Sequence, residues 1–410
     1  MDERPAGQVP WRVGPATRRP PVRVDPELLA QARRRVVAGG QGAAAVEQVV
    51  RDLGGVLGRE DRAALTGAVR AEVQGAGPLQ ALVDEPDVSD VLVNGPGQVW
   101  VDRGHGLEQV DLDLGSDADV RRLAVRLAAA GGRRLDDASP VVDARLPDGT
   151  RVHAVLPPVS GSGVLLSLRV LRRRAFRLGE LVRAGSVAPG VAEVLSTLVA
   201  GRANVLVSGA TGTGKTTMLS SLLSLVAPDE RVVCIEDAGE LAPDHPHVVR
   251  LVTRPPNVEG AGEMDLAALV RHALRMRPDR LVLGECRGAE VREVLSALNT
   301  GHSGGWATIH ANTAQDVPAR LETLSATAGM GREALAAQAA SALDAVVHLR
   351  RDGGLRHVSQ VGVVTRDPAG RLVVLPALTQ GVRGDVRREE GWSMLAQRSV
   401  GTGPGVSGVV

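Results

Sequence analysis

The chain has 410 residues, of which 43% are hydrophobic and 23% charged, a balance typical of globular proteins. This length exceeds what one ordinary core needs, so we expect two domains with flexible ends. The formal net charge of +1, with one Phe, four Trp and no Tyr, argues against nucleic-acid binding through bulk charge or base stacking, and no stable nucleic-acid binding is expected.

The sequence offers neither a membrane anchor nor a cysteine-based site. It contains no run of about 18 apolar residues, so no integral membrane segment is predicted. Residues 1–21 mix Arg, Pro and acidic residues without the apolar centre of a secretory signal. Two cysteines, Cys234 and Cys286, make neither a disulfide framework nor a zinc tetrad. A cytoplasmic location is therefore expected.

The first part of the chain falls into three predicted segments. Residues 1–25 are rich in Pro and Arg, lack periodicity and predict a disordered arm. Residues 26–76 carry apolar side chains at helical spacing, broken by Gly-Gly pairs, and predict a short helical segment. Residues 77–180 predict an α+β domain, with a strand-turn-strand over 88–102, a helix over 117–130, and strands over 141–146, 151–156 and 164–171.

From about residue 187 strands and helices alternate, and this second domain extends to residue 380. Strands are predicted over 204–208, 231–235, 281–284 and 307–310, and helices over 215–226, 266–276 and 289–298. Repeated β-α units indicate an α/β domain with a parallel sheet buried on both faces. Residues 381–410 are rich in Gly and Arg and predict a flexible tail.

The strongest motif follows the first strand of this second domain. Residues 209–216, GATGTGKT, fit the pattern G-x-x-x-x-G-K-[ST] between a strand and a helix. Glycines let backbone N–H groups surround phosphate oxygens, and the helix N-terminus adds its dipole. Lys215 would reach the β- and γ-phosphates and the Thr216 hydroxyl would ligate Mg²⁺, so ATP and Mg²⁺ are the expected ligands. The predicted nucleotide-binding residues are Gly209, Ala210, Thr211, Gly212, Thr213, Gly214, Lys215, Thr216 and Thr217.

Lys215 is the one lysine of the chain, and the other 47 of its 48 Lys and Arg residues are Arg. A GC-rich coding bias accounts for the excess of arginine. A position that keeps lysine under this bias indicates a place where a compact ammonium fits and a planar guanidinium does not.

Two further strands end in acidic residues. Glu236 and Asp237 follow the apolar residues 232–235, with Glu240 close behind, and Glu285 follows the apolar run 281–284. Ligands bind at the carboxyl ends of strands in open parallel sheets. These carboxylates are therefore candidates to hold a metal ion or to act on water, with helix capping as the alternative.

Two histidines flank the segment after the next helix, at positions 302 and 310. His310 ends another short strand at the same predicted edge of the sheet. It either hydrogen-bonds the γ-phosphate region or a carboxylate there, or is simply a packed ring.

Together these segments resemble the ATPases of type II and type IV secretion and pilus assembly. Four boxes match in order: GATGTGKTT (209–217), IEDAGEL (235–241), LRMRPDRLVLGECRG (274–288) and LNTGHSGGWATIHAN (298–312). The wording GECRG and the segment SPVVDARLPDGTRVHAVLPP (139–158) look most like the tight-adherence (Tad) pilus branch, whose ATPases are often called CpaF or TadA. The four-cysteine insertion of other pilus branches is absent, and the composition suggests an actinobacterial member.

The resemblance implies a RecA-like P-loop ATPase domain preceded by a smaller α+β domain, in a homohexameric ring. It assigns Glu240 as the base that acts on water, Glu285 as metal support, and His310 to the γ-phosphate region. Glu236 is a further candidate metal ligand, and Glu236 or Asp237 could exchange roles with Glu240.

The family's N-terminal domain contributes arginines to the nucleotide, and the matching positions are Arg145, Arg151 and Arg169. The alternative is that these are surface arginines of an arginine-rich protein.

The implied function is that of an ATP-driven motor that assembles a pilus or exports protein. Such a motor would associate peripherally with the inner face of the cytoplasmic membrane through a polytopic inner-membrane platform protein. Two alternatives stay open: a nucleotide-gated scaffold with little turnover, and a conjugation-type DNA translocase on the same core.

Overall fold

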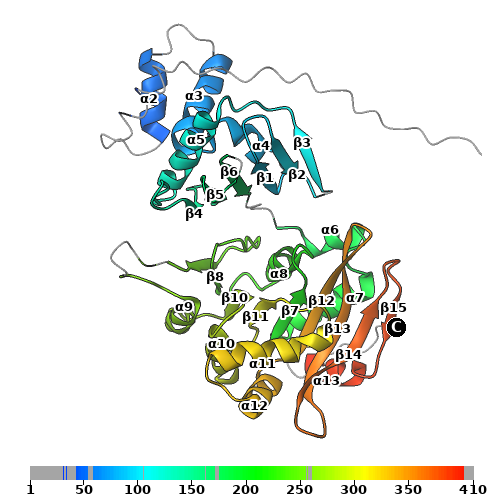
Figure 1. Ribbon diagram of the computed structural model, residues 1–410. Coiled ribbons are helices and arrows are strands. Elements are labelled where there is room, and N and C mark those ends of the chain that lie inside the picture. Colours follow the sequence, from blue (N-terminus) through cyan, green and yellow to red (C-terminus); the bar gives the residue numbers. More distant parts are fainter. Residues whose placement is uncertain are drawn as a thin grey trace, which may run out of the picture. The chain divides into compact units, whose positions relative to one another are not determined.

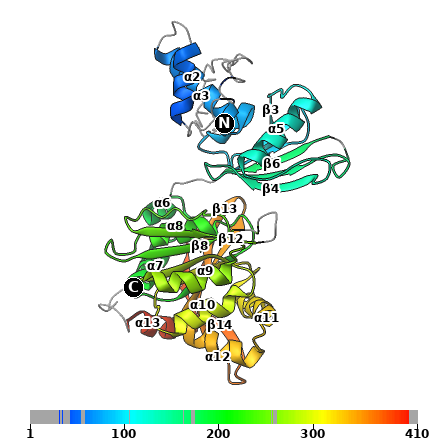
Figure 2. The same cartoon turned by 90° about the vertical axis from the view of Figure 1, so that its left-hand side faces the viewer.

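The structure is a computed structural model that describes residues 31, 34, 43–53, 59–104, 106–161, 163–170, 175–254, 256 and 261–400. The chain divides into two units, Met1–Val170 and Leu171–Val410 (Figures 1 and 2). The predicted disordered arm, residues 1–25, lies outside the described residues. No helix within the described ranges is long and apolar enough to cross a membrane.

Unit 1 is built on a six-stranded antiparallel sheet with strand order β3-β2-β1-β6-β5-β4. The predicted helix over 117–130 and the predicted strands of this region are confirmed, with small differences at their ends. The elements are α2 (Ala43–Leu53), α3 (Arg59–Gln74), η1 (Gly77–Leu79), α4 (Gln80–Val83), β1 (Asp90–Val93), β2 (Val99–Asp102), β3 (Leu107–Val110), α5 (Asp117–Ala130), β4 (Val141–Arg145), β5 (Arg151–Val155) and β6 (Leu165–Arg169).

The core of unit 1 lies between α5 and one face of the sheet. Helix α5 begins at Ser116, whose hydroxyl accepts a hydrogen bond from the N–H of Asp119 while the Asp119 carboxylate accepts one from the N–H of Ser116. Its apolar stripe packs against alternate strand residues such as Leu166 and Leu168. The alternate residues of β5 and β6 lie on the other face of the sheet, where Arg151 and Arg169 are exposed.

Unit 2 contains a nine-stranded sheet with strand order β15-β14-β13-β12-β7-β11-β10-β8-β9. Strands β12, β7, β11, β10, β8 and β9 run parallel, as predicted for this domain. Its elements are α6 (Leu178–Arg183), α7 (Pro189–Ala200), β7 (Val205–Gly209), α8 (Lys215–Leu223), β8 (Val232–Glu236), β9 (Val248–Val252), α9 (Leu266–Ala273), η2 (Leu274–Met276), β10 (Arg280–Cys286), α10 (Glu290–Asn299), β11 (Trp306–Ile309), η3 (Ala314–Asp316), α11 (Val317–Thr327), α12 (Arg332–Ala342), β12 (Ala345–Asp352), β13 (Leu355–Arg366), β14 (Leu372–Gln380), β15 (Val386–Arg388) and α13 (Trp392–Val400).

Helices cover both faces of the sheet of unit 2. Val205 and Val207 of β7 belong to a core shared with α7 and α8, whereas Leu206 between them belongs to a core shared with α9, α10 and α12. A strand whose successive side chains enter two cores is apolar at every position, which explains the unbroken apolar runs in the sequence. Figure 1 shows the two helical layers on either side of the strands.

The sheet continues beyond its parallel part in a way that was not predicted. Strands β13, β14 and β15 add antiparallel pairs at the β12 edge. Short turns join these strands, so the helix between strands that signals a parallel pair is absent, and the β-α pattern ends with α12.

The predicted boundaries need two corrections. Unit 1 ends at Val170, so residues 171–180 belong to unit 2 and not to the N-terminal domain, and α6, which was not predicted, begins within them. The predicted flexible tail is wrong for residues 381–400, which form β15 and α13. Leu395 of α13 is buried in the core, and Arg398 donates to the carbonyls of Leu343 and Val364. This contact was not predicted because residues 381–410 are rich in Gly and Arg.

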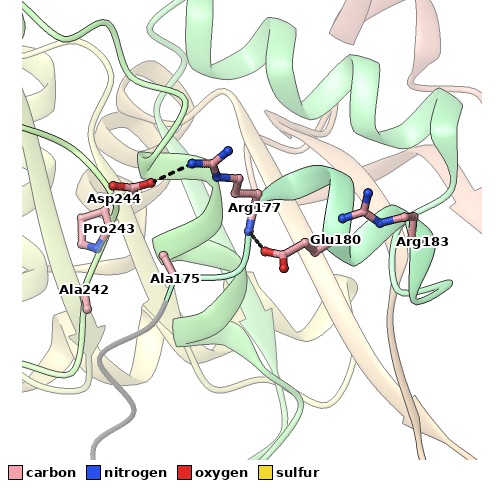
Figure 3. Close-up of a pocket in the computed structure, with 7 residues that line it drawn as sticks. All are labelled: Ala175, Arg177, Glu180, Arg183, Ala242, Pro243 and Asp244. Atoms are coloured by element: carbon pink, nitrogen blue, oxygen red, sulfur yellow. Dashed lines mark hydrogen bonds and ion pairs between the residues drawn. The ribbon is translucent and has the colours of Figure 1, made fainter.

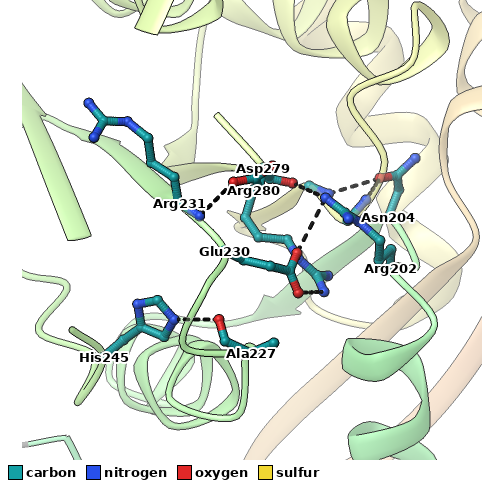
Figure 4. A network of polar contacts seen from close by, with 10 residues as sticks. Arg202, Asn204, Ala227, Glu230, Arg231, His245, Asp279 and Arg280 are labelled. Atoms are coloured by element: carbon teal, nitrogen blue, oxygen red, sulfur yellow. Dashed lines mark hydrogen bonds and ion pairs between the residues drawn. The ribbon is translucent and has the colours of Figure 1, made fainter. Parts of the chain in front are cut away.

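A buried polar network ties together the amino ends of four strands (Figure 4). Arg280, only 2% exposed, donates to both carboxylate oxygens of Glu230, at 2.7 and 2.9 Å. Asp279 accepts from the N–H of Arg231. Asn204 accepts from the N–H groups of Gly304 and Gly305. This network fixes the starts of β7, β8, β10 and β11 at the edge of the sheet opposite the phosphate loop.

Candidate functional site

The phosphate-loop motif occupies the turn between β7 and α8. All five residues of β7 are buried, and α8 begins at Lys215 directly after the loop. Gly209 has a φ of 152°, and a Cβ at this position would lie 2.6 Å from the carbonyl oxygen of Leu349. Only glycine allows the loop to leave the strand so close to β12.

The Lys215 side chain is turned back onto the loop. Its Nζ lies 3.0 Å from the carbonyl oxygen of Gly209 and 2.9 Å from that of Ala210. Burial lowers the pKa of the Lys215 ammonium, while the negative charge of Glu285 opposes this effect. Thr213 reinforces the loop by donating to the Ala210 carbonyl at 2.9 Å. The loop therefore holds a largely buried cation that donates to two neutral carbonyls, and a phosphate would be a stronger partner.

The structure brings Glu285 and His310 together beside this lysine. Glu285 lies near the end of β10 and His310 directly follows β11, the strand between β10 and β7. Their side chains approach to 3.2 Å, between His310 Nε2 and Glu285 Oε1. Burial lowers the pKa of His310 and the charge of Lys215 lowers it further, whereas Glu285 opposes both. These effects favour the neutral imidazole, which can donate or accept a hydrogen bond.

The acidic segment after β8 forms a second group. Glu236 is only 4% exposed, and its Oε1 accepts from the N–H of Leu241 at 2.8 Å. Burial raises the pKa of Glu236, whose Oε2 has no hydrogen-bond partner among the described residues. Asp237 pairs with Arg287 at 2.8 Å. Glu240 is half-buried on the turn that Glu236 fixes, so it is more accessible to water than Glu236.

The predicted Mg²⁺ ligands would supply only a few coordinating atoms from the protein. Thr216 is half-buried in the first turn of α8, and Glu285 is 41% exposed on the neighbouring strand end. No group of three or more His, Cys, Asp or Glu in the described part of the chain is arranged to hold a metal ion. These residues fit Mg²⁺ of the kind that keeps most of its waters and bonds to substrate phosphates. They do not fit a metal held by the protein alone.

Residue His348 belongs to this site and was missed from the sequence. It lies on β12, is 3% exposed, and its Nδ1 is 2.9 Å from Oγ of Ser208, the residue before the phosphate loop. Burial lowers its pKa, and the nearby Lys215 acts in the same direction. A histidine inside the apolar run of residues 345–349 was the signal for a buried polar contact.

The three predicted arginines of unit 1 form one row across its sheet. Arg145 lies opposite Arg151, and Arg151 lies opposite Arg169, so the three share a face. Arg169 pairs with Asp90 at 3.1 Å. Because the row belongs to unit 1 and the phosphate loop to unit 2, their role toward a nucleotide remains a prediction.

A cavity of about 630 Å³ opens elsewhere on unit 2 (Figure 3). It lies where the start of α6 meets the loop after Leu241, and Arg177 approaches Asp244 across it at 3.5 Å. None of the predicted site residues lines it. This cavity and the phosphate loop are therefore separate features of unit 2.

Comparisons with known proteins agree with the geometry. Residues 72–367 match the family described as type II/IV secretion system protein. A Mycobacterium tuberculosis protein, whose name assigns it provisionally to conjugal transfer, is 49% identical over 324 residues, covering 77% of this chain and 92% of that protein. The conjugal transfer protein TrbB of Rhizobium radiobacter is 31% identical over 288 residues, covering 69% of this chain and 85% of that protein.

Among solved structures, the pilus retraction motor PilT with bound ADP is similar, with a TM-score of 0.50 and 19% identity over 79% of this chain and 86% of that one. This likeness concerns the fold, and it confirms the predicted RecA-like core. The match over residues 72–367 includes the phosphate loop, both acidic strand ends and His310. The chain therefore belongs to the family of type II/IV secretion system ATPases.

Proposed function

We propose that this chain is the Mg²⁺-dependent, ATP-hydrolysing motor of a Tad or other type IV pilus, or of a related secretion apparatus. The observation that carries the proposal is the group of Lys215, Glu285 and His310 at one end of the sheet. It combines a buried cation for phosphate, a carboxylate, and a neutral imidazole. Phosphoryl transfer depends on such positioned charges more than on covalent chemistry by the protein.

Each residue has a definite part in the proposed reaction. Lys215 leaves its carbonyl partners and binds the β- and γ-phosphates, while backbone N–H groups of residues 210–217 surround the phosphate oxygens. Glu240 accepts the proton of the attacking water, and its accessibility favours it over the buried Glu236. His310, which faces Glu285 through Nε2 in this structure, turns its single N–H to donate a hydrogen bond to the γ-phosphate. Bound Mg²⁺ would neutralise phosphate charge, with Thr216 and Glu285 holding it and Glu236 as a further candidate.

The motor is proposed to act as a homohexamer on a polytopic inner-membrane partner, at the inner face of the cytoplasmic membrane. The arginine row of unit 1 supplies the coupling in this scheme, because an arginine carried by a moving domain stabilises transition-state charge only when the domain closes. The family match over residues 72–367 supports the secretion class. The absence of the four-cysteine insertion and the segment 139–158 favour the Tad branch, and the composition favours an actinobacterial source.

The test measures ATP hydrolysis by the purified chain and pilus formation or export in the host for the same variants. The purified full chain should hydrolyse ATP with Mg²⁺ but not with a chelator present, and Lys215→Ala should abolish both hydrolysis and pilus formation or export in the host. Glu240→Gln should retain nucleotide binding and lose turnover. A full chain without ATPase activity, combined with normal pilus formation by Lys215→Ala, would refute the motor. Normal pilus formation by Glu240→Gln would instead favour the nucleotide-gated scaffold.

A second candidate function is a DNA translocase, because two of the relatives bear conjugal transfer names. The net charge of +1 and the scarcity of aromatic residues weigh against it. DNA that binds in a salt-dependent manner and raises the ATPase rate would establish the translocase. An ATPase rate indifferent to DNA at low salt would exclude it.

A further inference from the structure

A β-hairpin stands beside the phosphate loop. Strand β12 pairs with β7 as far as Leu349, which lies opposite Gly209, and then continues through Asp352. Strand β13 returns from Leu355 after a turn at Gly353 and Gly354, whose φ values of 57° and 91° suit a two-residue hairpin. The tip of the β12–β13 hairpin therefore extends past the end of β7, where the loop begins.

One side chain of this hairpin touches the phosphate loop. Arg356 donates from Nε to the carbonyl oxygen of Gly212 at 2.9 Å. Its Cδ lies 3.7 Å from where a Cβ on Gly214 would be, so its aliphatic stem covers the end of the loop. The donor and acceptor are 144 positions apart in the chain. The contact thus joins two segments that the sheet has brought together.

The contact fixes the orientation of one peptide group. In a planar trans peptide the C=O of one residue and the N–H of the next point in opposite directions. When Arg356 holds the Gly212 carbonyl, the N–H of Thr213 must therefore point away from the arginine. Gly212 has a φ of 75°, a conformation that glycine adopts readily, and it has no Cβ to restrict rotation of this peptide.

We propose that Arg356 is a positioning residue for the nucleotide: it keeps the 212–213 peptide turned so that the Thr213 N–H can donate to a phosphate oxygen. The proposal rests on the proposed nucleotide-binding function of the loop. Without Arg356 the peptide would sample other orientations, and binding would have to fix it. Nucleotide affinity would fall and KM would rise, whereas kcat would change little.

The hairpin offers a matched control. Arg351 lies directly opposite Arg356 in the β12–β13 pairing, so the two side chains share a face. Both residues are exposed. Arg351 makes no hydrogen bond or ion pair with any described residue, whereas Arg356 holds the loop. Replacing either one removes the same charge from the same face.

The experiment compares full-length wild type, Arg356→Ala, Arg356→Lys, Arg351→Ala and Lys215→Ala. It measures the Kd for ADP by calorimetry and the KM and kcat for ATP. Hydrogen exchange of the amides of residues 210–217 is followed without nucleotide. We expect Arg356→Ala to raise Kd and KM about five- to tenfold, the order of one ordinary hydrogen bond because this contact is exposed to water, with kcat within about twofold. Loop amides should exchange faster in this variant.

Arg356→Lys should recover part of the affinity, because its ammonium can also reach the Gly212 carbonyl. Arg351→Ala should match wild type in all four measurements. Unchanged Kd, KM and loop exchange in Arg356→Ala would overturn the proposal. An equal effect of Arg351→Ala would do the same, because bulk charge would then be the cause. If wild type binds no ADP, the proposed function itself fails. If wild type binds and Lys215→Ala does not, a silent Arg356→Ala refutes the positioning role alone.

Discussion

Lys215 shows how a single side chain is specified by its surroundings. Its ammonium approaches two carbonyl oxygens at 3.0 and 2.9 Å from within a loop of small residues. A guanidinium is planar and wider, and it spreads its donors over five N–H groups. In a chain with 47 arginines, the loop has kept the one basic side chain that presents its charge as a compact point.

The first prediction replaces Lys215 by arginine, which keeps the positive charge but changes the shape of the charged group. Lys215→Arg should weaken ADP binding by about tenfold or more, because the planar group cannot enter between the two carbonyls without opening the loop. Calorimetry with ADP measures the loss. The reciprocal change Arg133→Lys, at an exposed position of unit 1, is the control and should bind as wild type does. Wild-type affinity in Lys215→Arg would show that charge alone matters in the loop.

The second prediction concerns pH and His348. Burial lowers the pKa of this imidazole from its ordinary 6.5, so the folded chain binds the proton less readily than the unfolded chain. The unfolded state therefore takes up more protons as pH falls from about 6.5 toward the lowered value, and the free energy of unfolding decreases over that window.

His348→Gln should flatten this dependence, because glutamine keeps a hydrogen bond to Ser208 and does not titrate. Urea unfolding between about pH 5 and 7.5 measures the slope. His272→Gln, at an exposed position of α9, controls for the loss of a histidine. A slope in His348→Gln as steep as in wild type would contradict the assignment.

At the scale of elements, the two ends of the parallel strands carry different groups of polar residues. The carboxyl ends carry the loop, Glu285 and His310, and the amino ends carry the Glu230–Arg280 network. Burial alone would raise the pKa of Glu230, but the hydrogen bond and charge of Arg280 outweigh it and hold the pKa below its ordinary value. This pair keeps β8 and β10 in register beneath the site.

The third prediction removes one partner of this pair. Glu230→Gln should lower the free energy of unfolding by about 3–5 kcal/mol, because the buried Arg280 loses the carboxylate that its Nε and Nη2 both bind. The double variant Glu230→Met, Arg280→Met should lose less. The wild-type advantage should be present above the ordinary pKa of Glu230, near 4.5, and disappear as pH falls through the lowered value. A double variant less stable than Glu230→Gln would show that the charge pair itself stabilises the fold.

The elements also show which parts of the fold could be predicted from the sequence. The strands around the phosphate loop contain short apolar runs that lead into glycine, an acidic residue or histidine, and these local signals located Lys215, Glu285 and His310. His348 and Arg356 reach the site through pairing between segments about 140 positions apart. No local sequence pattern predicts which of these distant segments pair. Helix α13 was not predicted because its short apolar group around Leu395 lies in a Gly- and Arg-rich stretch.

At the scale of the whole molecule, the charges proposed to act on one nucleotide come from two units. Unit 2 holds Lys215 in the loop, and unit 1 holds the row of Arg145, Arg151 and Arg169. Three guanidinium groups in one row repel each other, and the Asp90 carboxylate pairs with Arg169 at the end of the row. A row of this kind is suited to a polyanion that approaches the open face of the sheet.

The fourth prediction tests whether unit 2 binds the nucleotide while unit 1 contributes to catalysis. Arg151 is the central and exposed member of the row. Arg151→Ala in the full chain should lower kcat for ATP by about tenfold or more, because an arginine that acts only after domain closure stabilises the transition state. Its Kd for ADP should change little, since the phosphate loop belongs to unit 2. Steady-state kinetics and calorimetry on the same preparation measure both quantities.

Arg133→Ala is the matched control, because it removes an exposed arginine of unit 1 that lies outside the row. It should leave kcat and Kd at wild-type values. Thermal unfolding of both variants checks that unit 1 stays folded, and a surface change of this kind should shift stability by no more than about 0.5 kcal/mol. If Arg151→Ala keeps the wild-type kcat, the row takes no part in hydrolysis and unit 2 carries the chemistry by itself. If it raises Kd and leaves kcat unchanged, the arginine contributes to binding in the ground state, and closure of unit 1 would have to precede the chemical step.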